Sequence, residues 1–231
     1  MEFTLNNTLI FKSIEAERAE KMSSLCSESA QTEKQFLELL ALHNRKEKNI
    51  LEALNYAKNL NFSKNHLKSS YLSHPLRLAS YLIKIIPDIH SDYIVIALLH
   101  NVPETTEITI EELKTTFNET ISSGIDTLVI DRAAHFPSIQ KNYYKAIFSK
   151  GTALIMVKLI DKIDNLFVLG LNPDDEVRKN YIQEIREELL PFASNYNPLL
   201  GKYLDELLTD TAQLGYSDEL KQQLVAYQKT I

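Results

Sequence analysis

The sequence predicts an all-α protein, and two features of its composition favour this class. The 231 residues contain only five glycines, and all of them lie from Gly124 onward. The long stretches between the prolines are rich in Leu, Ala, Glu, Lys and Gln, which have high intrinsic helix propensities. Their apolar residues recur at helical spacing. We therefore expect helices throughout the chain.

Bulk composition limits the size of the core and the kinds of partner. With 44% hydrophobic and 24% charged residues, the chain can bury one sizeable core. Its net charge of -6 and pI near 5.6 argue against an extended nucleic-acid or anionic-membrane surface, which needs an excess of Lys and Arg. A local basic pocket for a phosphate ligand remains compatible with this charge.

The cysteine content and the N-terminal sequence indicate the compartment. Cys26 is the single cysteine, so no intrachain disulfide and no cysteine-rich metal site can form. The first residues lack the basic start and continuous apolar stretch of a secretory signal, and no run approaches the roughly 20 apolar residues of a membrane span. These features predict a cytoplasmic protein without a membrane partner.

The N-terminal third divides into an arm and the first helices of a domain. Residues 1–32 are expected to form an arm with a helix at 13–22, and residues 33–231 a single helical domain. Apolar residues at helical spacing between Glu33 and Leu60 predict one or two amphipathic helices. The charged run Arg45–Lys48 is expected to be a solvated face, and Asn61–Ser70 a loop.

The middle of the chain carries the clearest helix boundaries. Pro75 suits the first residue of a helix that ends at Pro87. Ser91 and Asp92 are candidate caps for the helix 91–101, whose nearly all-round apolar surface predicts a central position. Thr109 and Glu112 have the spacing of a capping box for a helix that runs to about residue 117. The remaining helices are expected at 118–130, 138–149, 152–169, 174–190, 199–213 and 217–229, with a turn between Pro191 and Pro198.

Three segments carry groups that bind metals or transfer protons. They contain His74, His100 and Asp161, each at the end of, or within, a helix expected in the core, where a polar side chain needs a partner. Two imidazoles with carboxylate or amide oxygens suit a divalent ion such as Mn, Fe or Zn, and a bound water would then be a nucleophile near neutral pH. The alternative is a structural helical protein in which the three segments do not converge.

The same segments resemble the motifs of a known superfamily. Tyr71–Leu76 is similar to Tyr-Ile-x-His-Pro, Ala97–Thr106 to Ala-Leu-Leu-His-Asp-Val-x-Glu-Asp-Thr, and Val157–Leu166 to Lys-Leu-Ala-Asp-x-x-x-Asn-Leu. These motifs, in this order, are those of the HD-domain phosphohydrolases, and particularly of the Rel/Spo guanosine tetraphosphate hydrolase domain. The resemblance extends from about residue 53 to 190 and implies an HD-domain-like helical bundle with extra C-terminal helices.

The resemblance also implies a reaction and a set of site residues. His74, His100, Asn101 and Asp161 would be the ligands of a divalent ion, most usually Mn, with Fe, Zn or Mg as alternatives. Glu104 and Thr105 match the acidic pair that orients or deprotonates the attacking water. The reaction in the relatives is removal of the 3′-pyrophosphate of guanosine tetraphosphate, so a nucleotide or another small phosphorylated ligand is the expected partner.

Six further residues are candidates for contacts to such a ligand. Asn165 matches the asparagine of the third motif. Lys64 and Lys68, in the loop before the first motif, can attract phosphate, with a solvated loop as the alternative. Tyr144 can stack on a base or lie in the helix core. Lys158 and Lys162 flank Asp161, and either can reach a phosphate or remain solvated.

Two positions depart from the motif where the chemistry is sensitive. Asn101 replaces the Asp of the His-Asp motif, and Thr105 replaces the second acid of the pair. An amide oxygen can coordinate a cation but brings no charge, and one charge pair at about 4 Å is on the order of 4 kcal/mol before desolvation. The sequence therefore predicts a weakened metal site, or none. The alternative function is a pseudoenzyme that binds a nucleotide or a protein, with a homo-oligomer or a protein partner on the arm and C-terminal helices.

Overall fold

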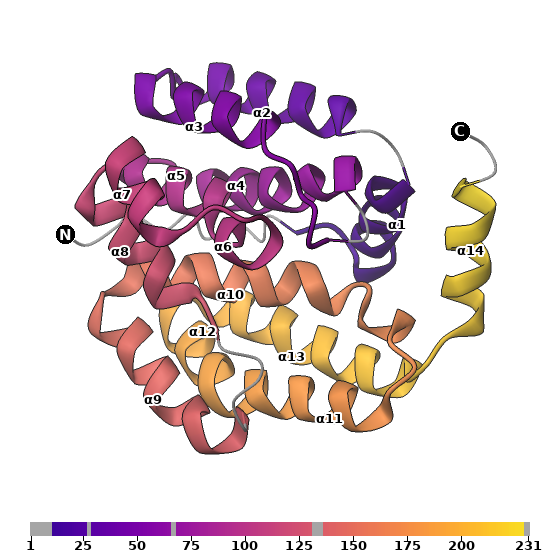
Figure 1. Cartoon of the computed structure of the whole chain (residues 1–231). Coiled ribbons are helices and arrows are strands. Elements are labelled where there is room, and N and C mark those ends of the chain that lie inside the picture. Colours follow the sequence, from indigo (N-terminus) through magenta and orange to yellow (C-terminus); the bar gives the residue numbers. More distant parts are fainter. Residues whose placement is uncertain (1–10, 27–28, 66–67, 131–135, 229–231) are drawn as a thin grey trace. The chain divides into compact units, whose positions relative to one another are not determined.

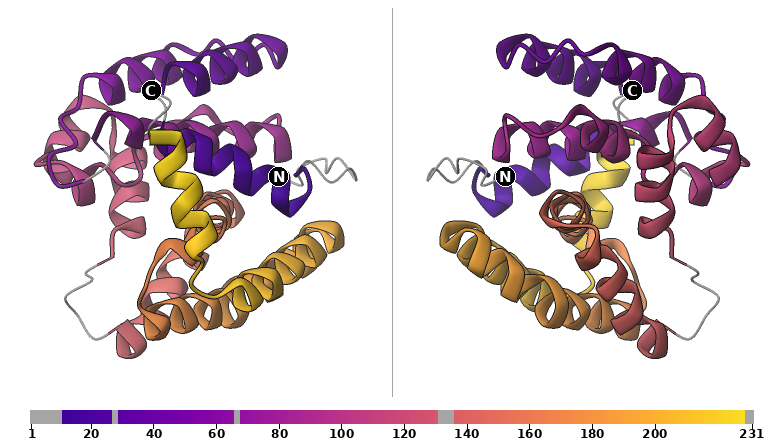
Figure 2. Two further views of the ribbon diagram at one scale, coloured as in Figure 1. Left: turned by 90° about the vertical axis from the view of Figure 1, so that its right-hand side faces the viewer. Right: turned by 90° about the vertical axis from the view of Figure 1, so that its left-hand side faces the viewer.

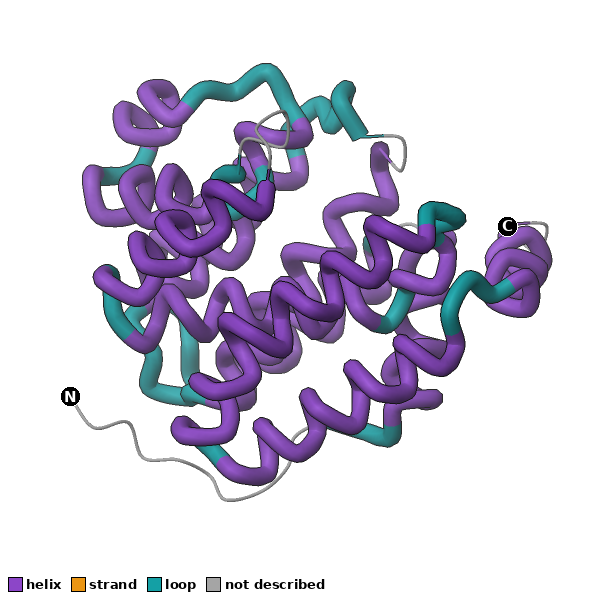
Figure 3. The backbone as a smooth tube through the Cα atoms, turned by 90° about the horizontal axis from the view of Figure 1, so that it is seen from below, coloured by secondary structure: helices purple, strands orange, loops and turns teal. Residues whose placement is uncertain are grey.

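A computed structural model describes residues 11–26, 29–65, 68–130 and 136–228, and every regular element in them is a helix (Figures 1 and 3). This confirms the all-α prediction. The chain divides into two compact units: unit 1 comprises Met1–Ser27 and Leu159–Ile231, and unit 2 comprises Glu28–Lys158. Among the described helices, none is both long and apolar enough to cross a membrane.

Unit 2 is built around two adjacent helices, α4 (Ser73–Ile85) and α5 (Ser91–Leu99). They pack against each other, α4 also contacts α2 (Ala30–Leu42), and α5 also contacts α3 (Lys48–Lys58) and α8 (Glu119–Leu128) (Figure 1). Residues 94–99 of α5 are all buried, as its all-round apolar surface predicts. The other elements of the unit are η1 (Lys68–Leu72), α6 (Val102–Thr105), α7 (Ile110–Thr116), α9 (Phe136–Ser149) and the first half of α10 (Thr152–Leu166).

The helix starts in unit 2 follow local capping chemistry. The capping box of α7 is present, because Glu112 N donates to Thr109 Oγ1 at 3.2 Å and Thr109 N donates to Glu112 Oε2 at 2.8 Å. The expected caps of α5 are wrong by one or two residues. His90 is the cap, since its Nδ1 accepts from Asp92 N at 3.3 Å. Helix α4 begins two residues before Pro75, because η1 leads into it directly.

Arg45 corrects the expectation of a solvated charged face. Its side chain is buried, and its guanidinium donates to the carbonyl oxygens of Pro87 and Ile89 at 2.7 Å each, and to Glu47 Oε1 at 2.7 Å. These bonds satisfy carbonyls in the connection between α4 and α5, which would otherwise lose hydrogen bonds to water. Arg45 thus fixes the segment that leads into α5.

Unit 1 combines the N-terminal helix with the C-terminal ones. It contains α1 (Ile14–Cys26), the end of α10, η2 (Leu169–Leu171), α11 (Asp175–Glu184), the π-helical turn η3 (Ile185–Leu189), α12 (Leu190–Tyr196), α13 (Pro198–Leu214) and α14 (Asp218–Gln228). Helix α13 packs against α12 and α11, and α14 packs against α1, beside which it lies in Figure 2.

The segment from Pro191 to Pro198 is a helix, not the expected turn. Pro191 is the second residue of α12, where a missing N–H is tolerated, and the preceding turn η3 is π-helical rather than α-helical. The chain reverses at Asn197, whose Oδ1 accepts from Leu199 N at 2.9 Å and Leu200 N at 3.3 Å. Asn197 is thus the cap of α13.

The expected N-terminal helix is present as α1, and it packs against other helices of unit 1. The Phe11 ring stacks on the Tyr203 ring with centroids 4.8 Å apart. Arg18 Nε donates to the Phe167 carbonyl oxygen at 3.3 Å, and Lys21 forms a buried ion pair with Asp164 of α10. Apolar stacking and buried charge together hold α1 against the end of α10 and α13.

Candidate metal centre

Two buried histidines lie side by side in unit 2. His74 is the second residue of α4 and His100 directly follows α5, so the packing of these two helices brings the rings together. Their centroids are 5.2 Å apart, and the side chains are 5% and 2% exposed. His100 Nδ1 lies 2.8 Å from the Ala97 carbonyl oxygen. Because a carbonyl only accepts, Nδ1 carries the hydrogen and Nε2 has the lone pair that a metal needs.

Asp161 is the third buried residue of a type that can ligate a metal ion. With His74 and His100 it makes up a set of residues that could hold such an ion. Asp161 lies on α10, three residues beyond Lys158 on the same continuous helix. Two imidazoles and one carboxylate form a donor set that suits Mn, Fe or Zn. The residues present therefore fit a divalent cation.

The third motif also forms the contact that its helical spacing predicts. Asn165 Nδ2 donates to Asp161 Oδ1 at 2.9 Å, which confirms that the two residues share one face of α10. A hydrogen-bonded carboxylate is oriented before a ligand arrives, as is usual around metal sites. Asn165 thus supports Asp161 in addition to any contact it makes with a ligand.

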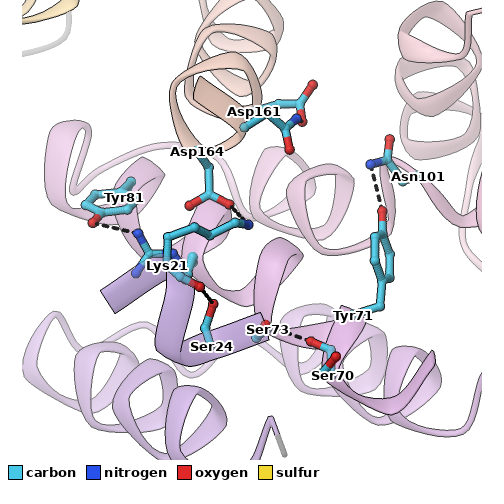
Figure 4. Close-up of polar contacts among 11 residues, drawn as sticks. Lys21, Ser24, Ser70, Tyr71, Ser73, Tyr81, Asn101, Asp161 and Asp164 are labelled. Carbon is cyan, nitrogen blue, oxygen red and sulfur yellow. Dashed lines mark hydrogen bonds and ion pairs between the residues drawn. The ribbon is translucent and has the colours of Figure 1, made fainter. Parts of the chain in front are cut away.

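Asn101 is bonded through its amide nitrogen. Its Nδ2 donates to the Tyr71 hydroxyl at 2.8 Å (Figure 4), and it makes no side-chain capping bond to α6. Tyr71 lies in η1, with its ring centroid 5.9 Å from that of His74 and 5.2 Å from that of Phe62. The sequence motif includes Tyr71, but no role was expected for it. Its position three residues before His74 is the signal that could have suggested one.

Glu104 and Thr105, the residues at the positions of the acidic pair, both lie in α6. The Thr105 hydroxyl donates to the Asn101 carbonyl oxygen at 2.7 Å and is buried. Glu104 is half-buried, and its Oε1 accepts from Ile130 N at 3.4 Å. Thr105 therefore serves the helix backbone, whereas Glu104 retains a carboxylate that can accept a proton.

The candidate ligand-binding lysines have different surroundings. Lys64 is partly exposed and pairs with Glu107 at 3.2 Å, and the side chain of Lys68 lies outside the described residues. Lys158 is buried, with its ammonium 5.5 Å from the centroid of the Tyr143 ring. Lys162 is buried and pairs with Glu184 at 2.7 Å. A carboxylate that neutralises a lysine reduces its attraction for phosphate, so the pairing with Glu184 weakens Lys162 as a phosphate ligand.

Tyr144 is among the largest fully buried side chains. Its ring lies against those of Tyr143 and Phe148, with centroids 5.3 and 6.3 Å away. Aromatic pairs at such distances are typical of packed cores. This placement agrees with the core alternative for Tyr144.

Known proteins are similar in sequence to about half of the chain. No protein-family profile matches the chain. The guanosine-3′,5′-bis(diphosphate) 3′-pyrophosphohydrolase of Aquifex aeolicus is 31% identical over 126 residues, or 53% of this chain, and the protein of the same name from Haemophilus influenzae is 31% identical over 132 residues. The GTP pyrophosphokinase rsh of Brucella ovis is 30% identical over 140 residues. The matches span 17–19% of the length of these relatives.

A solved structure with the same fold is that of a metazoan ortholog of SpoT, described as hydrolysing ppGpp and having a role in starvation responses. It aligns with a TM-score of 0.58 and 21% identity over 74% of this chain and 97% of its own. In fold, the chain is similar to this structure. About half of the chain is homologous to the proteins named as guanosine-3′,5′-bis(diphosphate) 3′-pyrophosphohydrolases.

Proposed function

We propose that the protein is a metal-dependent phosphohydrolase that acts on a nucleotide. The observation that carries this proposal is the buried pair of His74 and His100, whose ring centroids are 5.2 Å apart. Asp161 is a buried residue of a type that can complete the ligand set. Its relatives named as 3′-pyrophosphohydrolases support the 3′-pyrophosphate of guanosine tetraphosphate as the first substrate to test.

The donor set supports Mn as the first ion to test, followed by Fe, Zn and Mg. When bound, the ion would supply a Lewis acid that activates water near neutral pH. His74 and His100 are neutral nitrogen ligands, Asp161 supplies the negative charge, and Asn101 offers an amide oxygen. This ligand set is less negative by one charge than one with Asp at position 101, so we expect moderate metal affinity.

The remaining roles belong to residues around this group. Glu104 is the proposed proton acceptor, because it is the half-buried carboxylate of α6. Thr105 orients the site through its bond to the Asn101 carbonyl. We propose that Lys64, Lys68, Lys158 and Asn165 contact phosphate or ribose, and that Lys162 and Tyr144 shape the surrounding wall.

Turnover in the presence of Mn tests the proposal. The purified protein is incubated with a panel of nucleoside 3′- and 5′-phosphates, including guanosine tetraphosphate, and released phosphate or pyrophosphate is measured. We expect hydrolysis to fall at least about 100-fold in His100→Gln, since loss of a residue that only supports a metal ligand already costs about 10–100-fold and His100 is proposed as a ligand itself. His43→Gln, at the end of α2, is the matched control with unchanged activity. No turnover of any compound, where a known relative works, contradicts the proposal.

A pseudoenzyme that binds a nucleotide or a protein is the second candidate. The favouring observation is that neither Asn101 nor Thr105 supplies the acid expected in its place, and that the Thr105 hydroxyl is used in a backbone hydrogen bond. The double variant Asn101→Asp, Thr105→Asp separates the two functions. Activity that appears only in the variant supports the pseudoenzyme, whereas a native activity that the variant lowers supports the enzyme.

A further inference from the structure

We infer that Tyr71 is a positioning residue that presents the carbonyl oxygen of Asn101, and not its NH2 group, to a divalent ion held by the histidine pair. This inference rests on the proposed metal-binding function. It concerns which end of the side chain faces the ion, because asparagine can present an oxygen or a nitrogen, whereas aspartate presents only oxygens. The steps below use contacts within unit 2.

An asparagine at a metal site has one useful orientation. The amide oxygen carries lone pairs, whereas the NH2 group carries two donor hydrogens and no available lone pair. A rotation of about 180° at the end of the side chain exchanges the two groups with little change in shape. A carboxylate presents an oxygen in either orientation. With asparagine at position 101, a neighbour must therefore select the orientation if the side chain is to bind a cation.

In the structure, the Tyr71 hydroxyl acts as a hydrogen-bond acceptor toward this amide. Asn101 Nδ2 donates to it at 2.8 Å, a normal length for this bond. Because the two terminal atoms of an amide diverge from the same carbon, a nitrogen held by Tyr71 turns the oxygen away from Tyr71. Figure 4 shows the amide nitrogen, and not the oxygen, on the side of the tyrosine.

Tyr71 is itself held in place by packing. The residue is buried, and its ring centroid lies 5.2 Å from that of Phe62 and 5.9 Å from that of His74. It precedes His74 by three residues, and Asn101 directly follows His100. The hydrogen bond therefore connects the two segments that carry the two histidines, so the orientation of the amide is tied to the geometry of the pair.

A double-mutant cycle in Mn²⁺ affinity tests the inference without depending on activity. Dissociation constants are measured by calorimetry for the unmodified protein, Tyr71→Phe, Asn101→Asp and the double variant. We expect Tyr71→Phe to weaken Mn²⁺ binding about fivefold in the Asn101 background, the factor that corresponds to loss of one hydrogen bond. In the Asn101→Asp background, where either oxygen can bind, we expect a factor below about two.

Controls separate orientation from packing and from folding. Tyr143→Phe removes another tyrosine hydroxyl that makes a 2.8 Å bond, to the Leu128 carbonyl oxygen, and should leave Mn²⁺ affinity unchanged. Melting temperatures without metal verify that each variant is folded. An equal loss in both backgrounds would mean that the Tyr71 hydroxyl supports the site without acting through the amide orientation, and it would overturn the inference, as would an unchanged affinity in Tyr71→Phe.

The outcomes also distinguish this inference from the proposed function. Tight Mn²⁺ binding with the expected coupling but no hydrolysis contradicts the phosphohydrolase and leaves the role of Tyr71 intact. Hydrolysis without coupling between Tyr71 and Asn101 contradicts the role of Tyr71 and leaves the phosphohydrolase intact. Absence of Mn²⁺ binding by the unmodified protein contradicts both.

Discussion

Asn101 is the residue on which the chemistry of the candidate metal centre depends most. Two other candidate ligands are oriented by hydrogen bonds. His100 Nδ1 is bonded to the Ala97 carbonyl oxygen, and Asp161 is bonded to Asn165. Asn101 itself offers a neutral oxygen, and its nitrogen is bonded to Tyr71. The site is thus built from oriented ligands with a low total negative charge.

Replacing Asn101 with aspartate should strengthen metal binding. The substitution adds one negative charge next to the cation. An effect of even ~1.4 kcal/mol, well below the order of 4 kcal/mol of a charge pair before desolvation is subtracted, corresponds to tenfold in affinity. We expect Asn101→Asp to bind Mn²⁺ at least about tenfold more tightly by calorimetry. An unchanged dissociation constant would show that position 101 does not face the ion.

Side-chain hydrogen bonds to the first turn determine where several of the helices begin. Thr109 and Glu112 form a reciprocal pair at the start of α7, and Asp174 Oδ1 accepts from Glu176 N at 2.9 Å and Val177 N at 3.1 Å at the start of α11. These bonds satisfy backbone donors that the first turn of a helix leaves without partners. The starts of α7 and α11 could therefore be predicted, because these partners lie two or three residues apart, whereas the cap of α5 was misplaced.

The capping box makes the stability of α7 depend on pH. The bonds that Glu112 accepts from the backbone and side chain of Thr109 lower its pKa. Because the folded pKa is below the unfolded one, the stabilisation is complete above the ordinary glutamate pKa and is lost as pH falls through the folded pKa. We expect Glu112→Gln to lower the melting temperature at pH 7 but to have less effect in acid below that pKa. The same decrease at both pH values would contradict an ionic contribution.

Helices α12 and α13 approach each other closely at Gly201. A Cβ at this position would lie 2.5 Å from both Cα and Oγ of Ser194, so backbone would have to move. We expect Gly201→Ala to lower the free energy of unfolding by about 1–3 kcal/mol, the usual cost of overpacking, in a urea titration. Gly124→Ala, which would meet the flexible end of the Ile96 side chain, is the matched variant with the smaller loss. Equal losses would argue against the close backbone approach as the cause.

On the scale of the whole molecule, segments distant in sequence form one packed unit. Unit 1 joins residues 1–27 to residues 159–231, and α1 contributes Lys21 to a fully buried pair with Asp164 (Figure 4). Arg18 on the same helix forms an ion pair with Asp210 of α13. Charged residues in a helix of low overall hydrophobicity thus hold α1 in the unit.

The buried pair predicts a large effect from a single substitution. Lys21→Met leaves the Asp164 carboxylate buried with one cation fewer, and breaking a buried pair in this way typically costs about 3–5 kcal/mol. We expect a corresponding fall in the free energy of unfolding measured with urea. Lys48→Met removes the exposed pair Lys48–Glu52, whose side chains are 89% and 56% exposed, and should cost about 1 kcal/mol or less.

A second variant distinguishes loss of the ion pair from loss of packing. Lys21→Met combined with Asp164→Leu removes both charges, and we expect it to recover much of the stability that Lys21→Met loses, because no carboxylate remains buried in the pair. Additive losses from the two substitutions would contradict the importance of the pair.

The sequence by itself determined the all-α class, most helix positions, the capping box and the three residues His74, His100 and Asp161. These features depend on periodicity and bonds within a few residues, or on motifs whose residue types the chemistry requires. Only the tertiary structure decided that Arg45 is buried, that Tyr71 binds the amide nitrogen of Asn101, and that Lys21 pairs with Asp164. Each of these contacts joins segments 30 to more than 100 residues apart, and it exists only because packing brings their helices together, which no local pattern records.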